Sequence, residues 1–483
     1  MRDLDPALDP TGGAFVAAVD ALLARGPGRM VPDLARITRL CELLGDPQRA
    51  YPSIQVTGTN GKGSATRMIS TLLAAAGVQP GTYTSPHLQT IRERIRVGER
   101  PISPRAFAEV AEELAPLVGM VDVEHDDRMT FFEVLTAMAF WWFADAPVDV
   151  GVFEVGMGGT WDATNLVRGE VAVVQPVDVD HSELGSTPVE VAGEKSGIIK
   201  QGAVAVLAAQ PADVLDVLLA RCEAVGATPW LAGEAFEVLE RRIAIGGQVL
   251  DLRVGDRVLT EVLLPLHGRH QADNAAVALA AVAAFLGESF ATLDDDVLRA
   301  GFGAVTVPGR MEVVHREPTI LLDGAHNPHG ARAAAETVAE SFDFRTLVLV
   351  TGVLADKDVR GILAPWRDVV QHVVVTRPPS PRALGTADLA VSAAEVWAGT
   401  GVIVEDAEDV ADALEKARGL VGPGDGILVS GSLVTVGAAR EALLPLERDD
   451  DEVIEPPDAS DEDVDEAELQ RAIDEMLDQL DDG

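Results

Sequence analysis

The sequence predicts an α/β fold in which mostly parallel strands are covered by helices. Three observations support this expectation. Short apolar runs alternate with segments of helical periodicity along most of the chain. A glycine-rich segment at 57–64 joins an apolar strand to a helix, as phosphate-binding loops of α/β proteins do. A Pro308-Gly309 pair divides the alternation into two series, which indicates two domains.

The first series contains predicted strands at 53–56, 148–155 and 171–174, and predicted helices at 15–24, 65–76, 104–117 and 131–143. The second series predicts a doubly wound domain. Its strands are expected at 319–322, 346–350, 372–375, 401–404 and 426–429, with helices at 330–342 and 410–418. We therefore expect one domain over 1–304, a second over 310–446, and a separate C-terminal tail over 447–483.

The tail differs from the body in charge. Residues 449–483 contain 17 Asp/Glu and one Arg, within a chain whose net charge is −40. Such a segment cannot bury a core, so we expect it to be disordered. Its last part has apolar residues at helical spacing, at positions 469, 473, 476, 477 and 480. This spacing fits either a docking helix or a frayed amphipathic end.

Composition excludes several classes of protein. The negative charge disfavours nucleic-acid and anionic-membrane partners. The two cysteines, Cys41 and Cys222, form no C-x-x-C pair, which argues against a disulfide scaffold and fits a reducing compartment. The chain shows neither a signal-peptide pattern nor an apolar run long enough to span a membrane. We expect a cytoplasmic protein.

The run T-G-T-N-G-K-G-S at 57–64 carries the clearest chemistry. Its glycines allow backbone N–H groups to surround phosphate oxygens at the N-terminus of the following helix. Lys62 would reach the outer phosphates, and the Ser64 hydroxyl suits Mg²⁺. The spacing departs from G-x-x-x-x-G-K-[ST], since Gly63 separates Lys62 from Ser64. The expected nucleotide-binding residues of the run are Gly58, Thr59, Asn60, Gly61, Lys62, Gly63 and Ser64.

This loop and a series of ordered segments resemble the folate branch of the Mur ligase superfamily, the folylpolyglutamate and dihydrofolate synthases. The segments are S-P-H-L at 85–88, R-E-R-I at 92–95, E-V-G-M-G-G-T-W-D-A-T-N at 154–165, D-H at 180–181, G-E-K-S-G-I-I-K at 193–200, H-G-R-H-Q-A-D-N-A-A at 267–276, P-G-R-M-E at 308–312 and D-G-A-H-N-P at 323–328. The resemblance implies a P-loop central domain followed by a Rossmann-like C-terminal domain.

The resemblance also implies the site residues. It gives Ser64, Ser85, Glu154 and His181 as Mg²⁺ ligands, and Asn274, Arg310 and Asp323 as further nucleotide contacts. Lys62, Lys195, His181 and Arg310 are the implied catalytic residues. Lys195 matches a lysine that is commonly carbamylated in the family; the alternative is a plain amine that pairs with phosphate. His326 is expected where the incoming glutamate binds, and the pteroate pocket is expected at Leu34, Ala35, Arg36, Ile37, Thr130, Trp161, Asp162 and Ala163.

The implied activity is a ligase that uses ATP and two Mg²⁺ ions to add L-glutamate to folates through an acyl phosphate. A monovalent cation such as K⁺ is a further expected cofactor. Expected substrates are L-glutamate, dihydropteroate and folates, acted on by a monomer. We expect both dihydrofolate synthase and folylpolyglutamate synthase activity, with a monofunctional folylpolyglutamate synthase as the alternative. A cell-wall Mur ligase normally has an extra domain before the loop, whereas only 56 residues precede Thr57. A regulator without ligase activity should lack Glu154, Lys195 or His181, and all three are present.

Overall fold

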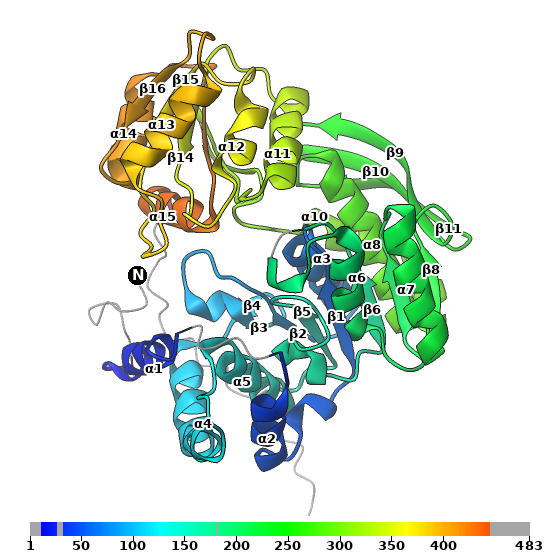
Figure 1. Cartoon of the computed structure of the whole chain (residues 1–483). Helices are drawn as coiled ribbons and strands as arrows, with labels where there is room; N and C mark the ends of the chain where they lie inside the picture. Colours follow the sequence, from blue (N-terminus) through cyan, green and yellow to red (C-terminus); the bar gives the residue numbers. More distant parts are fainter. Residues whose placement is uncertain (1–10, 27–31, 180–181, 445–483) are drawn as a thin grey trace, which may run out of the picture. The chain divides into compact units, whose positions relative to one another are not determined.

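The central sheet of the protein has eight strands in the order β4-β3-β2-β5-β1-β6-β7-β8 (Figure 1). The computed structural model describes residues 11–26, 32–179 and 182–444. Six strands are parallel, and β3 and β4 add an antiparallel edge. The strands are β1 (Ser53–Thr57), β2 (Pro80–Tyr83), β3 (Ile95–Val97), β4 (Arg100–Pro101), β5 (Val150–Glu154), β6 (Val171–Val174), β7 (Val204–Leu207) and β8 (Thr228–Leu231).

Alternate strand residues face opposite layers of helices, as expected for a parallel sheet covered on both faces. In β6, Val171 and Val173 pack toward one cluster, while Ala172 and Val174 pack toward another. The first layer contains α3 (Lys62–Ala75), α8 (Arg269–Leu286) and α10 (Asp295–Gly303). The opposite layer contains α1 (Ala14–Leu23), α2 (Ala35–Leu43), α4 (Pro104–Glu124), α5 (Phe131–Asp145), α6 (Pro188–Lys195) and α7 (Ala212–Val225).

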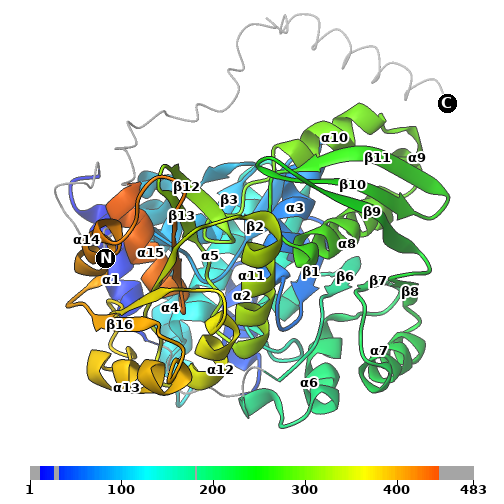
Figure 2. The same cartoon turned by 90° about the horizontal axis from the view of Figure 1, so that it is seen from above.

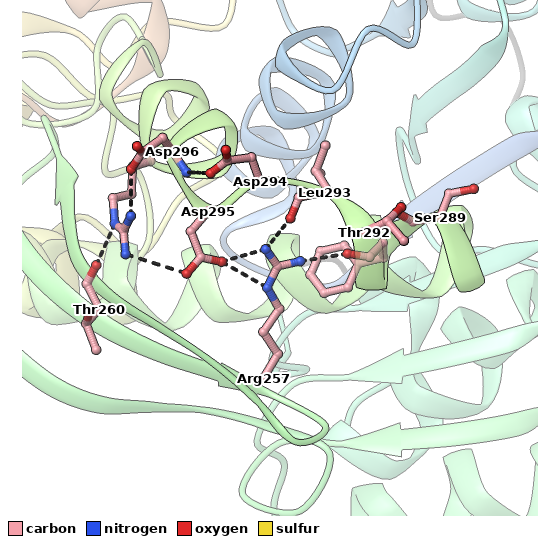
Figure 3. Close-up of polar contacts among 10 residues, drawn as sticks. Arg257, Thr260, Ser289, Thr292, Leu293, Asp294, Asp295 and Asp296 are labelled. Carbon is pink, nitrogen blue, oxygen red and sulfur yellow. Dashed lines mark hydrogen bonds and ion pairs between the residues drawn. The ribbon is translucent and has the colours of Figure 1, made fainter.

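A three-stranded antiparallel sheet covers α8 and α10 (Figure 2). Its strands are β9 (Phe236–Ala244), β10 (Gly247–Val254) and β11 (Arg257–Leu264). Arg257 anchors β11 to the segment containing α9 (Glu288–Thr292): its guanidinium binds the Asp295 carboxylate and the Leu293 carbonyl, and it lies 4.8 Å from the Phe290 ring centre (Figure 3). Our sequence prediction contained no part of this sheet.

The second domain contains a six-stranded sheet in the order β12-β13-β17-β14-β15-β16, parallel except for β12. Its strands are β12 (Glu312–Arg316), β13 (Thr319–Leu322), β14 (Leu347–Thr351), β15 (His372–Val375), β16 (Ile403–Asp406) and β17 (Gly426–Ser430). Its helices are α11 (Pro328–Ser341), α12 (Val359–Leu363), α13 (Thr386–Val396), α14 (Val410–Gly419) and α15 (Leu433–Leu443). The predicted α/β class and the doubly wound second domain are confirmed.

The predicted elements differ from the structure mainly at their ends. Helix α4 continues through Pro116 to Glu124, beyond the predicted end at 117, because Val118 and Val121 are buried and keep the chain helical. Helix α3 begins at Lys62 rather than 65, so the lysine is the first helical residue. Strand β16 lies two residues later than predicted. The predictions for the tail at 447–483 and for His181 fall outside the described residues. No helix in the described ranges is long and apolar enough to cross a membrane.

Candidate active site

The phosphate loop connects β1 to α3, and two of its glycines have backbone angles that side chains rarely adopt. Gly58 has φ of 144°, and a Cβ there would lie 2.5 Å from Gln175 Cβ. Gly61 has φ of 85° and is the residue before α3. Thr59 closes the other side of the loop, where its hydroxyl donates to the Asp178 carbonyl at 2.6 Å. The N-terminus of α3 therefore points into a backbone cradle of the kind that binds phosphate.

Two lysines converge on one carbonyl of this loop. Lys62 Nζ donates to the Gly58 carbonyl at 2.9 Å and to the Thr59 carbonyl at 3.1 Å. Lys195 Nζ, from the last residue of α6, donates to the same Gly58 carbonyl at 2.9 Å. Lys195 is only 4% exposed. The loop thus carries two positive charges, from lysines far apart in the sequence, where an anionic ligand would bind.

Helix α8 supports the loop from the side. Asn274 Nδ2 donates to Gln271 Oε1 at 3.0 Å, and Gln271 Nε2 donates to the Ser64 hydroxyl at 3.3 Å. A Cβ on Gly61 would lie 2.7 Å from Asn274 Oδ1, so Asn274 touches the loop, and its contact with nucleotide stays a prediction. Our sequence analysis gave Gln271 no role. One feature of the sequence indicates that Gln271 belongs to the site. It lies three residues before Asn274 in a helix, and residues three apart share a helix face.

Glu154, the last residue of β5, lies beside the start of α3. It is 5% exposed, and its Oε2 accepts a hydrogen bond from the Ser85 backbone N–H at 2.9 Å. Burial raises the pKa of Glu154, while the positive charges of Lys62, Arg310 and Arg94 act to lower it. Positive charges from three different elements therefore act on this carboxylate.

The donor set fits Mg²⁺. The Glu154 carboxylate and the Ser64 and Ser85 hydroxyls are hard oxygen donors, and Mg²⁺ commonly takes one or two carboxylates together with phosphate oxygens and water. Within the described ranges no group of three or more His, Cys, Asp or Glu side chains could hold a metal alone. His181, the remaining predicted ligand, lies outside the described residues.

The second domain contributes Arg310 and Asp323. Asp323 accepts hydrogen bonds from the backbone N–H groups of Met311 at 2.9 Å and Ala325 at 3.0 Å. Burial raises the pKa of Asp323, and the Arg310 charge opposes this rise. Arg310 therefore acts on carboxylates of both domains, Glu154 and Asp323. A groove of about 990 Å³ runs along the linker beside Arg310, and the phosphate loop is not part of its lining.

Helix α11 begins against the loop. Asn327, its N-cap residue, donates from Nδ2 to Asn60 Oδ1 at 3.1 Å, and Asn60 Nδ2 lies 3.2 Å from His329 Nδ1. Asn327 and His329 were not among the predicted site residues. The predicted His326 lies just before this helix, with Nδ1 2.9 Å from the Gly324 carbonyl.

The predicted pteroate residues fall into two places. Near α2, Arg36 Nε donates to Glu133 Oε1 at 3.0 Å, and the Thr130 N–H donates to Glu133 Oε2 at 2.8 Å, so Glu133 joins these two predicted positions. Leu34 and Ala35 begin the same helix, and Ile37 is fully buried in the core.

The other predicted pteroate residues lie between β5 and β6. The buried Asp162 accepts hydrogen bonds from the N–H groups of Met157 at 2.8 Å and Thr164 at 3.0 Å, and Ala163 is buried beside it. The Trp161 N–H donates to Glu194 Oε1 at 3.4 Å, next to Lys195. The second group is thus held by its own loop and by α6, whereas Arg36 and Thr130 are held by Glu133.

Comparisons with known proteins agree with this arrangement. Residues 56–282 match the Mur ligase middle domain, and residues 309–433 match the Mur ligase, glutamate ligase domain. The chain is 47% identical over 440 residues to dihydrofolate synthase/folylpolyglutamate synthase of Mycobacterium tuberculosis, covering 85% of this chain and 90% of the relative. It is 32% identical to the Bacillus subtilis protein of the same name, covering 85% of this chain and 95% of that relative.

The structure also resembles a solved one. It matches Mycobacterium tuberculosis folylpolyglutamate synthase complexed with ADP with a TM-score of 0.84 and 46% identity, covering 89% of this chain and 98% of that one. The loop, the domain order and these similarities agree. The chain belongs to the dihydrofolate synthase/folylpolyglutamate synthase branch of the Mur ligase family.

Proposed function

We propose that this chain uses ATP to join L-glutamate to two kinds of acceptor, dihydropteroate and folates. The observation that carries the proposal is the convergence of Lys62, Lys195, Glu154 and Arg310 around the phosphate loop. Residues 1–304 would bind ATP and the acceptor, and residues 310–446 would contribute Arg310 and the glutamate site near His326. The proposed enzyme is a cytoplasmic monomer that acts on small molecules.

The chemistry proceeds in two steps. A carboxylate oxygen of the acceptor attacks the γ-phosphorus of ATP, the bond from that phosphorus to the bridging oxygen breaks, and ADP leaves. The amine of glutamate, having lost a proton, then attacks the acyl carbon, and inorganic phosphate leaves as the amide forms. Phosphorylation is needed because an unactivated carboxylate has no adequate leaving group.

The side chains of the site would position the substrates and neutralise the negative charge of the phosphates. Lys62 and the loop N–H groups would hold the phosphates, and Arg310 would neutralise charge on the transferred phosphoryl group. Asp323 accepts from the N–H of Met311, the residue after Arg310, and from the Ala325 N–H in its own loop, which would orient Arg310. Ser64, Ser85, Glu154 and His181 would hold Mg²⁺, which supplies further positive charge at the phosphates when bound.

Lys195 would be carbamylated in the active enzyme. In the structure its ammonium shares the Gly58 carbonyl with Lys62, so two like charges lie close together. Attack of the neutral Lys195 amine on CO₂, with loss of one proton, forms an N–C bond and an anion. The carbamate retains one N–H for the Gly58 carbonyl, and its negative charge would face the positive charge of Lys62.

Phosphate release in the presence of ATP, Mg²⁺ and glutamate tests the function. We expect release with dihydropteroate and with tetrahydrofolate, each yielding the glutamylated product by mass spectrometry. Activity with tetrahydrofolate alone would support a monofunctional folylpolyglutamate synthase. Activity only with a cell-wall precursor such as a UDP-linked muramyl acceptor would refute the folate assignment.

A further inference from the structure

Arg94 is a buried arginine with an unusual set of partners. It is the last residue of a short helical turn, Ile91–Arg94, and is 9% exposed. Its Nε donates to His87 Nδ1 at 2.9 Å, and its guanidinium carbon lies 5.2 Å from the Phe131 ring centre. These two contacts hold the guanidinium on one edge and one face, which fixes the direction of its remaining N–H groups.

The two terminal amino groups of Arg94 have no hydrogen-bond or carboxylate partner among the described residues. An arginine carries five N–H donors, and here only Nε is used. Arg36 shows the usual alternative: it is 5% exposed, and its guanidinium forms an ion pair with Glu133. The four remaining N–H groups of Arg94 have no partner among the described residues and are not among the fully enclosed side-chain atoms, so a ligand can reach them and accept their hydrogen bonds.

The position of Arg94 indicates which part of a substrate it meets. Its charge acts on Glu154, as the charges of Lys62 and Arg310 do. On its other side, Phe131 directly follows Thr130, which caps α5 at the predicted acceptor pocket. Arg94 therefore lies between the phosphoryl-transfer groups and the acceptor region. In the proposed reaction, the acceptor carboxylate must occupy that place.

We propose that Arg94 is a substrate-binding residue whose terminal N–H groups bind the acceptor carboxylate that receives the phosphoryl group. His87 is a positioning residue, which accepts from Nε and sets the plane of the guanidinium. This inference depends on the proposed function. A planar guanidinium with two free amino groups matches the two oxygens of a carboxylate. Dihydropteroate and folates both present such a carboxylate to the phosphate loop, so one residue serves both acceptors.

The test compares Arg94→Lys and Arg94→Gln with the parent, using dihydropteroate and tetrahydrofolate separately. Lysine keeps the charge but loses the paired donors, and glutamine loses both. We expect the KM for each acceptor to rise about 10- to 100-fold, the range for loss of charge-assisted hydrogen bonds. The KM for ATP and the Kd for ADP should change less than about twofold, because the loop is intact. Added guanidinium ion should partly restore Arg94→Gln with both acceptors.

Arg96→Lys is the matched control. Arg96 lies two residues further on in β3, where its guanidinium donates to the Glu99 carbonyl. The Arg96→Lys variant should have the same KM as the parent for both acceptors. His87→Ala provides a second variant, in which Arg94 remains but loses its partner at Nε. We expect His87→Ala to raise the KM for both acceptors about 3- to 10-fold. This test applies even if the Arg94 variants fail to fold.

The outcomes separate the two proposals. Unchanged acceptor KM values in folded Arg94 variants, or in His87→Ala, would overturn the inference while leaving the ligase function intact. A rise for tetrahydrofolate alone would also overturn it, because Arg94 would then bind a group that dihydropteroate lacks. A parent enzyme that is inactive with both acceptors would refute the proposed function, and the inference with it.

Discussion

Replacing Gly61 with alanine tests how closely the loop and helix α8 are packed. Gly61 has φ of 85°, and a new Cβ would lie 2.7 Å from Asn274 Oδ1. Two costs follow. An L-residue in this backbone conformation costs about 1–2 kcal/mol. Displacing Asn274, which is held by Gln271 at 3.0 Å, adds about 1–3 kcal/mol of overpacking. We expect a loss of unfolding free energy of roughly 2–5 kcal/mol.

A matched control separates these costs. Gly77, just beyond the end of α3, has φ of 80°, and a Cβ added there would have no atom within 4 Å. Gly77→Ala should therefore lose only the backbone term, about 1–2 kcal/mol, with unchanged nucleotide affinity. Gly61→Ala should also weaken ADP binding about tenfold or more, because Asn274 and the loop both shift.

Urea unfolding and calorimetric titration with ADP measure both quantities. In the double variant Gly61→Ala/Asn274→Ala, the crowding disappears, so its loss of unfolding free energy should be smaller than the sum of the two single losses by about 1 kcal/mol or more. If Gly61→Ala and Gly77→Ala are equally destabilised and both bind ADP normally, the contact between Gly61 and Asn274 has no energetic consequence and the reasoning fails.

Four further predictions concern charge, metal and the tail. Lys62→Ala should lower kcat roughly 10²- to 10³-fold while the protein stays folded, since Lys62 is half-buried and donates to loop carbonyls; near-normal turnover would contradict its phosphate role. Glu154→Gln can still accept from the Ser85 N–H but loses its charge, so activity should fall steeply and recover only partly with excess Mg²⁺; a normal Mg²⁺ dependence would exclude Glu154 as a ligand. Lys195→Ala should be nearly inactive and partly restored by formate, and ¹³CO₂ should give a carbamate signal in the parent only; full activity in CO₂-depleted buffer would show that Lys195 acts as a plain cation. Truncation after Glu447 should leave the rate and thermal stability unchanged and lower solubility, whereas a large loss of activity would assign the tail a role.

Local sequence patterns predicted the parts of the fold in which neighbouring residues decide the structure. Strands β6, β13 and β15 have the predicted bounds because short, mostly apolar runs are buried on both faces of a parallel sheet. The antiparallel sheet was missed because Glu240, Arg241 and Arg242 interrupt the apolar residues of its first strand and break the alternation expected of a strand. The sheet also packs on α8 and α10, and this long-range contact is not visible in the local pattern.

The α/β class, the nucleotide loop and the family could be predicted without coordinates, because each depends on residues close together in the chain or on ordered motifs. Which distant groups meet depends on how the chain packs. Lys62 and Lys195 share one carbonyl, Gln271 reaches Ser64 across 207 positions, and Asn60 meets Asn327 across 267. Packing also buries Arg94 and leaves its terminal amino groups without a partner among the described residues. This could not be read from the sequence, although His87, which accepts from its Nε, is only seven residues away. The sequence shows which charged residues are present and how far apart they are along the chain. The energy of each charge depends on its burial and on the orientation of its side chain, and both are set by how the chain packs.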